Sequence, residues 1–337
     1  MAERRLSGGM RIPLDAELLR LLVIAAVIVA VIAIATSGRF FSSAAFSAMA
    51  FQFPELGVFS LAIMLSLITG GIDLSIVSTA NLSGIIAALV LTRLIPEAPT
   101  SVQMVLGLTT AIGVALATGC MCGYVNGLLI ARVGITPILA TLGTMQLYMG
   151  ISYVITRGPA IAGFPEPFLV LGNGSLFGLP VSLLIFASLA VVTAVMLNRS
   201  RFGIQLYLLG SNETAARFSG IPVKRMLIRT YFLCGALSAI GGLLVVAHAN
   251  SAKADYGSSY LLQALLVAIL GGVHPSGGFG KVTGVVIAVV SLQVLSSGFS
   301  MLRFSQFAKE LVWGALLLFI MVLNTLEQQR KARARPP

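Results

Sequence analysis

Apolar runs of about 20 residues, separated by short polar segments, follow one another along almost the whole chain. A helix needs about 20 apolar residues to cross roughly 30 Å of hydrocarbon, and the sequence lacks the alternating ten-residue pattern of a membrane barrel. The pattern therefore predicts an all-α, polytopic integral membrane protein with about ten transmembrane helices. We place these at 18–36, 48–69, 75–92, 102–122, 136–156, 180–197, 229–249, 259–273, 282–300 and 307–324.

The basic residues indicate how these helices are oriented. With the N-terminus in the cytoplasm, 16 of the 22 Lys and Arg residues fall on the cytoplasmic side, as the positive-inside rule requires. We therefore predict that both termini are cytoplasmic. The domains expected are a cytoplasmic N-terminal segment at 1–17, a transmembrane domain at 18–324 with a cytoplasmic loop at about 198–229, and a basic cytoplasmic tail at 325–337.

Composition and rare residues narrow the functional class. The chain is 57% hydrophobic and 10% charged, with a net charge of +11. The grouping of that charge follows the positive-inside rule, so we expect no nucleic-acid partner. Cys120 and Cys122 lie within one apolar run, and His248 and His274 fall at opposite ends of predicted crossings, so we expect no metal site. The first run is long and lacks a cleavage site, which favours a retained helix over a signal peptide.

The longest polar stretch, "GSNETAARFSGIPVKR" from Gly210 to Arg225, predicts a short helix. Ser211 or Asn212 can cap its N-terminus, and Gly220 is placed to end it. Charged residues that suit the helix dipole stand near its two ends: Glu213 and Arg217. The helix would cover about 213–219, which is too short to be stable alone in water, so another surface must hold it.

The same stretch carries small and apolar side chains that suit a contact. Ala215 and Ala216 would let a neighbouring surface approach the backbone closely, while Phe218 and Ile221 supply an apolar anchor. Two interpretations follow: an ordinary interfacial helix that joins two crossings, or a docking helix for a cytoplasmic partner. Composition does not separate them.

Two Gly-Gly segments form a weak internal echo. "ITGGIDLSIVS" (68–78) and "ILGGVHPSGGFG" (269–280) each place Gly-Gly between apolar runs. The echo is too short to establish a duplication. We expect structural roles for the glycines of the two segments: Gly70, Gly71, Gly271, Gly272, Gly277 and Gly278.

Polar residues in or beside the crossings are candidates for a translocation path. Asp73 could bond a solute's hydroxyl groups, or it could cap a broken helix end by accepting backbone N–H bonds, which we favour because a helix restarts at Leu74-Ser75. Three uncharged residues could bond a solute or join two helices: Asn81, Asn126 and Gln146. A lone carboxylate argues weakly for proton coupling, since such carriers usually show several.

Several motifs together resemble one family. The pattern Gly210, Ala215-Ala216, Gly220-Ile221 resembles the cytoplasmic coupling loop of ABC-importer permeases. "TGGIDLS" (69–75), "NGLLIARVGITPILATLGTM" (126–145) and "LGGVHPSGGFGKVTGVVIAV" (270–289) are similar, in order and spacing, to the family of ribose, galactoside and autoinducer-type sugar permeases. Branched-chain amino-acid permeases are more distant members. The resemblance covers about residues 45 to 324.

The resemblance implies a multi-pass subunit of a bacterial inner (plasma) membrane importer. Two permease subunits, identical or related, would pair around a path. Two ATP-binding cassette subunits would dock on the coupling loops, and an extracytoplasmic solute-binding protein would deliver the solute. This chain would be no enzyme and bind no cofactor, because ATP and Mg would be used by the partner ATPase. Consistent with this, the sequence contains no G-x-x-x-x-G-K-[ST] phosphate loop.

One departure bears on the solute. Many sugar permeases of the family carry an acidic Glu-Leu-Asp pattern before the late Gly-Gly, where this chain has Leu261-Leu262-Gln263. That puts a plain ribose-like solute in doubt and is closer to autoinducer-type permeases. We therefore expect import of a monosaccharide or sugar-like solute. The alternatives are a branched-chain amino-acid ABC permease, which the "GGIDLS" segment disfavours, and an ion-coupled secondary transporter that works alone.

Overall fold

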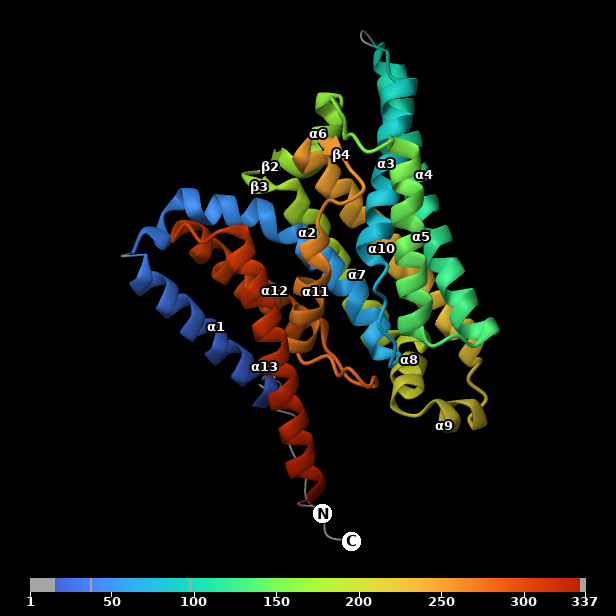
Figure 1. The fold of residues 1–337 in the computed structure, drawn as a ribbon, viewed down its shortest axis with the longest axis vertical. Coiled ribbons are helices and arrows are strands. Elements are labelled where there is room, and N and C mark those ends of the chain that lie inside the picture. Colours follow the sequence, from blue (N-terminus) through green and yellow to red (C-terminus); the bar gives the residue numbers. More distant parts are fainter. Residues whose placement is uncertain (1–15, 37, 97–98, 334–337) are drawn as a thin grey trace, which may run out of the picture.

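A computed structural model describes residues 16–36, 38–96 and 99–333 of the chain (Figure 1). The helices are α1 (Ala16–Ala35), η1 (Arg39–Phe41), α2 (Ser43–Ile68), α3 (Ile76–Leu94), α4 (Ser101–Leu128), the π-helix η2 (Leu129–Val133), α5 (Pro137–Thr156), α6 (Glu166–Asn173), α7 (Val181–Arg199), α8 (Arg201–Ser211), α9 (Glu213–Phe218), α10 (Val223–Ala249), α11 (Ser258–Leu270), α12 (Val282–Met301) and α13 (Gln306–Arg333). The strands are β1 (Ile161–Ala162), β2 (Ser175–Leu176), β3 (Leu179–Pro180) and β4 (Ser251–Ala252).

The predicted all-α, polytopic fold is confirmed. Each of the ten predicted crossings corresponds to one helix, namely α1 to α5, α7 and α10 to α13. Eight of these are long and apolar enough to cross a membrane, whereas the apolar stretch of α1 (Leu21–Ala35) and α11 are shorter. At 1.5 Å per residue, the 13 residues of α11 extend about 20 Å. The predicted run 259–273 was too long because Gly271 caps the helix and Gly272 turns the chain with φ +84°.

The two ends of the molecule differ in what they carry. We call them the α9 end, with α8, α9 and the loops after α2 and α11, and the α6 end, with α6 and the short strands (Figure 1). Helix α13 extends toward the α9 end. Of the predicted cytoplasmic segments, residues 1–15 and 334–337 lie outside the described part of the chain.

Helix α2 forms the centre of the bundle. Every residue from Pro54 to Ile68 is buried, and the helix packs against α3, α7, α10, α11 and α12. Small residues permit these close contacts, because the ring of Phe186 occupies the place that a side chain on Gly57 would fill. Helices α4 and α10 cross at Gly123 and Gly235 with backbone touching backbone, the packing expected where apolar helices cannot gain from the hydrophobic effect.

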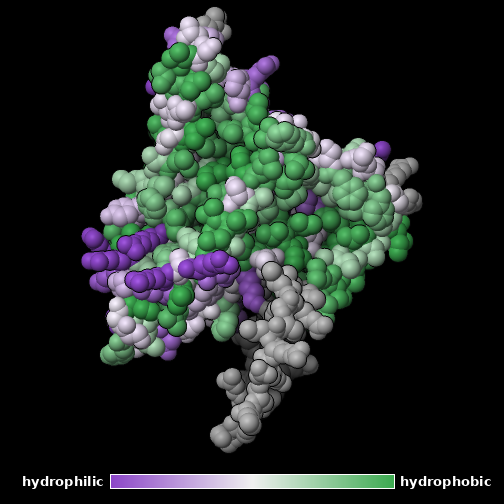
Figure 2. Space-filling view, turned by 180° about the vertical axis from the view of Figure 1, so that it is seen from behind, coloured by the Kyte–Doolittle hydropathy of each residue, from purple (hydrophilic) through white to green (hydrophobic). Residues whose placement is uncertain are grey.

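An apolar belt surrounds this centre. Within the apolar windows, 83% of the residues of α2 are buried, against 28% for α4, α5 and α7 and 6% for α13. Outward-facing residues such as Val154 and Leu318 leave most of their surface exposed, and Figure 2 shows the continuous hydrophobic surface that results. Apolar side chains exposed on long helices are the expected contact with lipid.

The segment 157–179, predicted to be a turn-rich loop, contains α6, β1, β2 and the first residue of β3. Antiparallel β1 pairs with β4, and β2 pairs with β3. Pro167 at the start of α6 supplies the fixed φ of a first helical turn, and Glu166 suits the dipole there. The helix packs on α10, where the Asn173 side-chain amide donates to the Ala247 carbonyl at 3.0 Å. The prolines that predicted a turn here therefore also begin a helix.

Candidate functional site

Helix α9 is the short helix predicted from the polar stretch. It runs from Glu213 to Phe218, one residue shorter than predicted. Asn212 is its N-cap, since its side-chain oxygen accepts from the Ala215 N–H at 2.9 Å. Gly220 follows with φ +78°, a left-handed conformation that glycine adopts without steric cost. Arg217 and Glu213 form an exposed ion pair at 2.8 Å. The caps that the sequence predicts are therefore confirmed.

One face of α9 is fixed to the bundle and the other is open. Ala216 and Ile221 are 3% and 9% exposed and belong to the central core cluster. Of the two residues of the predicted apolar anchor, Ile221 packs on the bundle, whereas Phe218 is 89% exposed and points away from it. The short helix thus presents a large aromatic side chain to its surroundings, on a backbone held in place by buried neighbours.

Glycines from three segments meet behind α9. A Cβ on Gly277 would lie 2.7 Å from the backbone nitrogen of Gly70 and 2.8 Å from the carbonyl oxygen of Gly210. A Cβ on Gly210 would overlap the carbonyl of Ile68, and the Gly278 N–H donates to that same carbonyl at 3.0 Å. We call the set of Gly70, Gly210, Gly277 and Gly278 the glycine node. It joins the end of α8 to the loops after α2 and α11, and so brings together the two halves of the internal echo.

The remaining motif glycines serve packing nearby. A Cβ on Gly71 would lie 2.6 Å from the Tyr231 hydroxyl, and one on Gly271 would lie 2.8 Å from the Val285 backbone. Gly272 has φ +84° at the end of α11. Beside them, the Tyr207 hydroxyl on α8 donates to the Gly280 carbonyl at 2.7 Å. Helix α8 is therefore fastened to the loop after α11 at several points.

Basic side chains surround this end of the molecule. In Figure 2, hydrophilic surface gathers on the side that carries α8 and α9. The exposed basic residues of this region are Arg132, Arg199, Arg201, Arg217, Lys224, Arg225 and Arg229. Seven of the 16 basic residues that the sequence assigns to the cytoplasmic side thus lie in this region.

Asp73 lies in the loop between α2 and α3, where it caps the turn. Its carboxylate accepts from the Ser75 backbone N–H at 3.0 Å and from the Ser75 hydroxyl at 2.7 Å. The Asn126 amide donates to the same hydroxyl at 2.7 Å. Burial raises the pKa of the Asp73 carboxyl to about 6, although the two bonds from Ser75 act to lower it. Asp73 thus accepts one backbone bond in the turn, as the capping interpretation expects, but the helix begins at Ile76 with Ser75 as its N-cap and not at Leu74-Ser75.

The two other path candidates lie apart from Asp73. The Asn81 amide donates to the carbonyls of Ala254 and Tyr256, each at 2.9 Å, and so fixes the segment that precedes α11. Gln146 is exposed on α5. The structure therefore brings Asp73 and Asn126 together, connects Asn81 to a different loop, and places Gln146 on an outer face.

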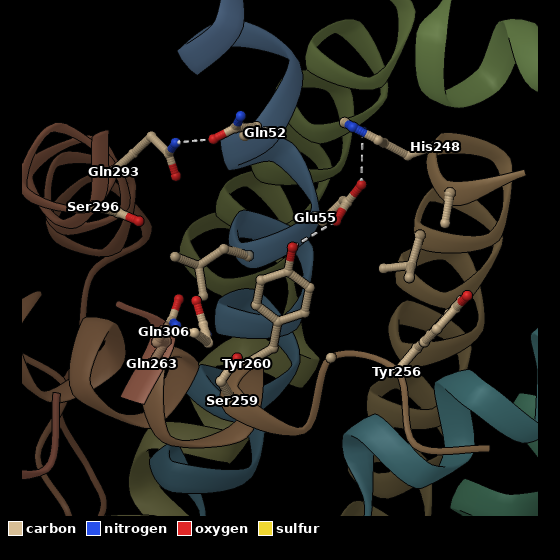
Figure 3. A pocket seen from close by; sticks show the side chains of 14 residues that line it. Gln52, Glu55, His248, Tyr256, Ser259, Tyr260, Gln263, Gln293, Ser296 and Gln306 are labelled. Carbon is tan, nitrogen blue, oxygen red and sulfur yellow. Dashed lines mark hydrogen bonds and ion pairs between the residues drawn. The ribbon is translucent and has the colours of Figure 1, made fainter. Parts of the chain in front are cut away.

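A polar cavity of about 470 Å³ lies between α2, α10, α11, α12 and α13 (Figure 3). Each helix contributes from the part nearer the α6 end. The lining residues are Gln52, Glu55, Leu56, Val245, His248, Ala249, Tyr256, Gly257, Ser259, Tyr260, Gln263, Gln293, Ser296 and Gln306. None of the four path candidates named from the sequence lines it.

The carboxylate of Glu55 stands at the centre of this cavity. The Tyr260 hydroxyl donates to its Oε2 at 2.8 Å, and His248 Nδ1 lies 3.1 Å from its Oε1. The Gln293 amide donates to the Gln52 side-chain oxygen at 3.1 Å. Three helices, α2, α10 and α11, therefore meet at one buried carboxylate.

Sequence reasoning missed Glu55, although a signal was present. A carboxylate six or more residues inside an apolar run is a candidate functional residue in its own right, and Glu55 lies eight positions into the predicted crossing 48–69. His248 was placed correctly at the opposite end from His274, which follows α11 near the glycine node. Its ion pair with Glu55 joins residues 193 positions apart, which one sequence does not reveal.

Comparison with known proteins agrees with this arrangement. The family described as "Branched-chain amino acid transport system / permease component" matches residues 45–321. The autoinducer 2 import system permease protein LsrD of Yersinia enterocolitica is 32% identical over 281 residues, which cover 82% of each chain. LsrD of Yersinia pestis (strain Pestoides F) is 31% identical over 82% of this chain and 81% of its own. No solved structure matches.

The family match spans most of the chain and includes α2 to α12, the glycine node, α9 and the cavity. The relatives named above are permeases of import systems. Together with the eight long apolar helices, these findings describe a multi-pass protein of the bacterial inner membrane. The chain therefore belongs to the family of permease components of the branched-chain amino acid transport system, and it is a permease subunit of an ABC-type importer.

Proposed function

We propose that this chain carries a small sugar-like solute into the cytoplasm, driven by ATP that partner subunits hydrolyse with Mg. The relatives named above are autoinducer 2 import permeases, so this solute or a close chemical relative is the first candidate cargo. The chain itself supplies the path and the docking surface. A second permease subunit, two cassette ATPases and an extracytoplasmic binding protein complete the importer.

The α9 end is the cytoplasmic end in this proposal. Its exposed basic residues support that orientation, because Lys and Arg are enriched in cytoplasmic loops. Both termini and the tail would then lie in the cytoplasm, and the α6 end would face the solute-binding protein.

The observation that carries the proposal is the two-sided burial of α9. Ala216 and Ile221 are fixed in the core, whereas Phe218 is 89% exposed beside the Glu213–Arg217 pair. A rigid exposed aromatic residue is the kind of anchor that fills a partner's pocket. The glycine node supports transmission, since α8 ends against the loops after α2 and α11. Movement of α9 by an ATPase would therefore reach two helices of the path.

A branched-chain amino-acid cargo is the second candidate, because the family's description names it. The relatives named above and the polar lining of the cavity favour a hydroxylated solute. An aliphatic side chain would need an apolar pocket.

The test is uptake by the assembled importer in proteoliposomes. We expect accumulation of autoinducer 2 that requires the binding protein, the cassette ATPase and ATP, with little uptake of L-leucine. Uptake of L-leucine alone would establish the second candidate. Accumulation by the purified chain without an ATPase would overturn the proposal in favour of a secondary transporter.

A further inference from the structure

The polar cavity between α2, α10, α11, α12 and α13 brings many polar side chains together within a helical membrane bundle. The cavity has a volume of about 470 Å³ (Figure 3). Its lining includes four glutamines, three residues with a hydroxyl group on α11 and α12, and the Glu55–His248 pair. Glu55, Gln263 and Gln293 are 5%, 8% and 6% exposed. Polar groups this deep in a membrane protein are costly unless they are satisfied, and they mark paths and binding sites.

The chemistry of the lining matches alcohols. A glutamine amide both donates and accepts, as does each serine or tyrosine hydroxyl, which is the pattern that a hydroxyl group needs from its surroundings. Each oxygen of the Glu55 carboxylate has about two lone-pair positions. The Tyr260 hydroxyl occupies one on Oε2, and His248 Nδ1 lies 3.1 Å from Oε1. The carboxylate therefore keeps acceptor capacity toward the cavity while it is held in a fixed orientation.

We propose that this cavity is a solute-binding site within the permease, selective for an uncharged, polyhydroxylated molecule, with Glu55 as its central acceptor. The assignment rests on the proposed importer function and names the solute class for it. Tyr260 and His248 are positioning residues for the carboxylate, and Gln263 and Gln293 line the same cavity from α11 and α12.

The same lining works against two other classes of solute. A phosphate or carboxylate group would be placed close to the carboxylate of Glu55, which repels a like charge. A branched aliphatic side chain would find only Leu56, Val245 and Ala249 among mostly polar neighbours. The departure from the acidic pattern noted at Leu261-Leu262-Gln263 bears on the same site, because Gln263 lines it with a neutral amide.

Cysteine labelling in the assembled importer tests occupancy of the site. Ser259 lines the cavity, whereas its neighbour Ser258 is exposed and does not, so Ser259→Cys and Ser258→Cys form a matched pair with the same substitution one residue apart. We expect autoinducer 2 or ribitol to slow maleimide labelling of Ser259→Cys from outside severalfold and to leave Ser258→Cys unchanged. D-ribose 5-phosphate and L-leucine should protect neither. Equal protection at both positions, protection by the phosphate, or no protection by the neutral probes would overturn the assignment.

Substitution of the acceptor gives an independent readout. Glu55→Gln and Tyr260→Phe should each raise the half-saturating autoinducer 2 concentration for uptake about tenfold, the effect of losing a hydrogen bond to a charged group. Glu310→Gln and Tyr124→Phe make the same changes at exposed positions outside the cavity and should leave the half-saturating concentration unchanged. If the wild-type importer transports autoinducer 2 and the cavity variants have the same half-saturating concentration, the assignment of the binding site is wrong, but the importer function stands. If the wild-type importer shows no ATP-dependent uptake, the function itself fails, and the labelling experiment still decides whether the cavity binds.

Discussion

The backbone N–H of Gly278 donates a hydrogen bond of 3.0 Å to the carbonyl oxygen of Ile68, the last residue of α2. This bond joins two segments about 210 positions apart in the chain, and the end of α8 packs directly against it through Gly210. Helix α9, which begins two residues after the end of α8, is therefore connected through close backbone contacts to the end of α2 and to the loop after α11. Four predictions follow from this arrangement and its surroundings.

Gly210 has no room for a side chain. In Gly210→Ala the new Cβ would overlap the Ile68 carbonyl, so we expect the free energy of unfolding to fall by about 1–3 kcal/mol, the usual cost of overpacking, with a matching loss of ATP-dependent uptake. Gly113→Ala on α4 is the control, because a Cβ there meets nothing within 4 Å. Thermal unfolding of the purified permease in detergent measures the difference. Equal stability of the two variants would contradict the tight contact at Gly210.

Ala216 and Ala215 differ in burial although they are neighbours. Ala216→Leu would force three extra carbons into a 3% exposed position and should displace α9 from the core, at a cost of about 1–3 kcal/mol. Ala215→Leu makes the same change on the exposed face and should leave the stability of the isolated permease unchanged. Differential scanning fluorimetry of the two variants, without ATPase present, checks this. A stable Ala216→Leu variant would show that α9 is not fixed as described.

Phe218 should matter for partners and not for folding. Because its side chain is 89% exposed, Phe218→Ala should keep the melting temperature of the permease. It should weaken binding of the cassette ATPase about tenfold or more, as expected for an aromatic anchor that becomes buried in the interface. Phe177→Ala removes a phenylalanine that is 95% exposed at the α6 end and serves as the control. Co-purification and surface plasmon resonance with the ATPase provide the measurement. Normal ATPase binding by Phe218→Ala would remove this residue from the docking surface.

The buried carboxyl of Asp73 should make stability depend on pH. Its pKa is raised from 3.8 to about 6 by burial, so the folded protein holds this proton more tightly than the unfolded chain does. The group's contribution is fully present below about pH 4 and is lost as the pH rises to about 6, a change of about 3 kcal/mol.

Asp73→Asn keeps the acceptor for Ser75 and removes the titration. We expect the melting temperature of the wild type to fall, relative to that of Asp73→Asn, between about pH 4 and pH 6 and to run parallel above pH 6. Asp255→Asn alters an exposed carboxylate paired with Lys253 and controls for the loss of an acidic residue. Parallel curves for wild type and Asp73→Asn over the whole range would show that Asp73 titrates normally.

Local signals predicted the elements of this structure well. The ten apolar runs became ten helices, and the cap residues Asn212 and Gly220 mark the two ends of α9. These features depend on short stretches of sequence, where periodicity, caps and glycine act directly. Helix α6 was not predicted, because the prolines at its start are also typical of a turn.

Long-range relationships could not be predicted in the same way. The meeting of Gly70, Gly210 and Gly277 and the ion pair between Glu55 and His248 both join distant segments. They depend on how helices pack, which apolar periodicity does not encode when helices are apolar on every side. A six-residue helix also has too few residues to show which face is inward, so the sequence left the direction of Phe218 open.

The shortness of α11 has a mechanical consequence. Its 13 residues extend about 20 Å, with Tyr260 near the first residue and Gln263 near the middle. The other end of the helix leads into Gly271 and the loop that carries Gly277 and Gly278. A helix of this length without internal proline or glycine can tilt as a rigid body, so a movement at one end reaches the other end without rearrangement of the side chains between them. A push at the α9 end that shifts the foot of α11 must therefore change the shape of the space around Glu55, unless the helix itself bends.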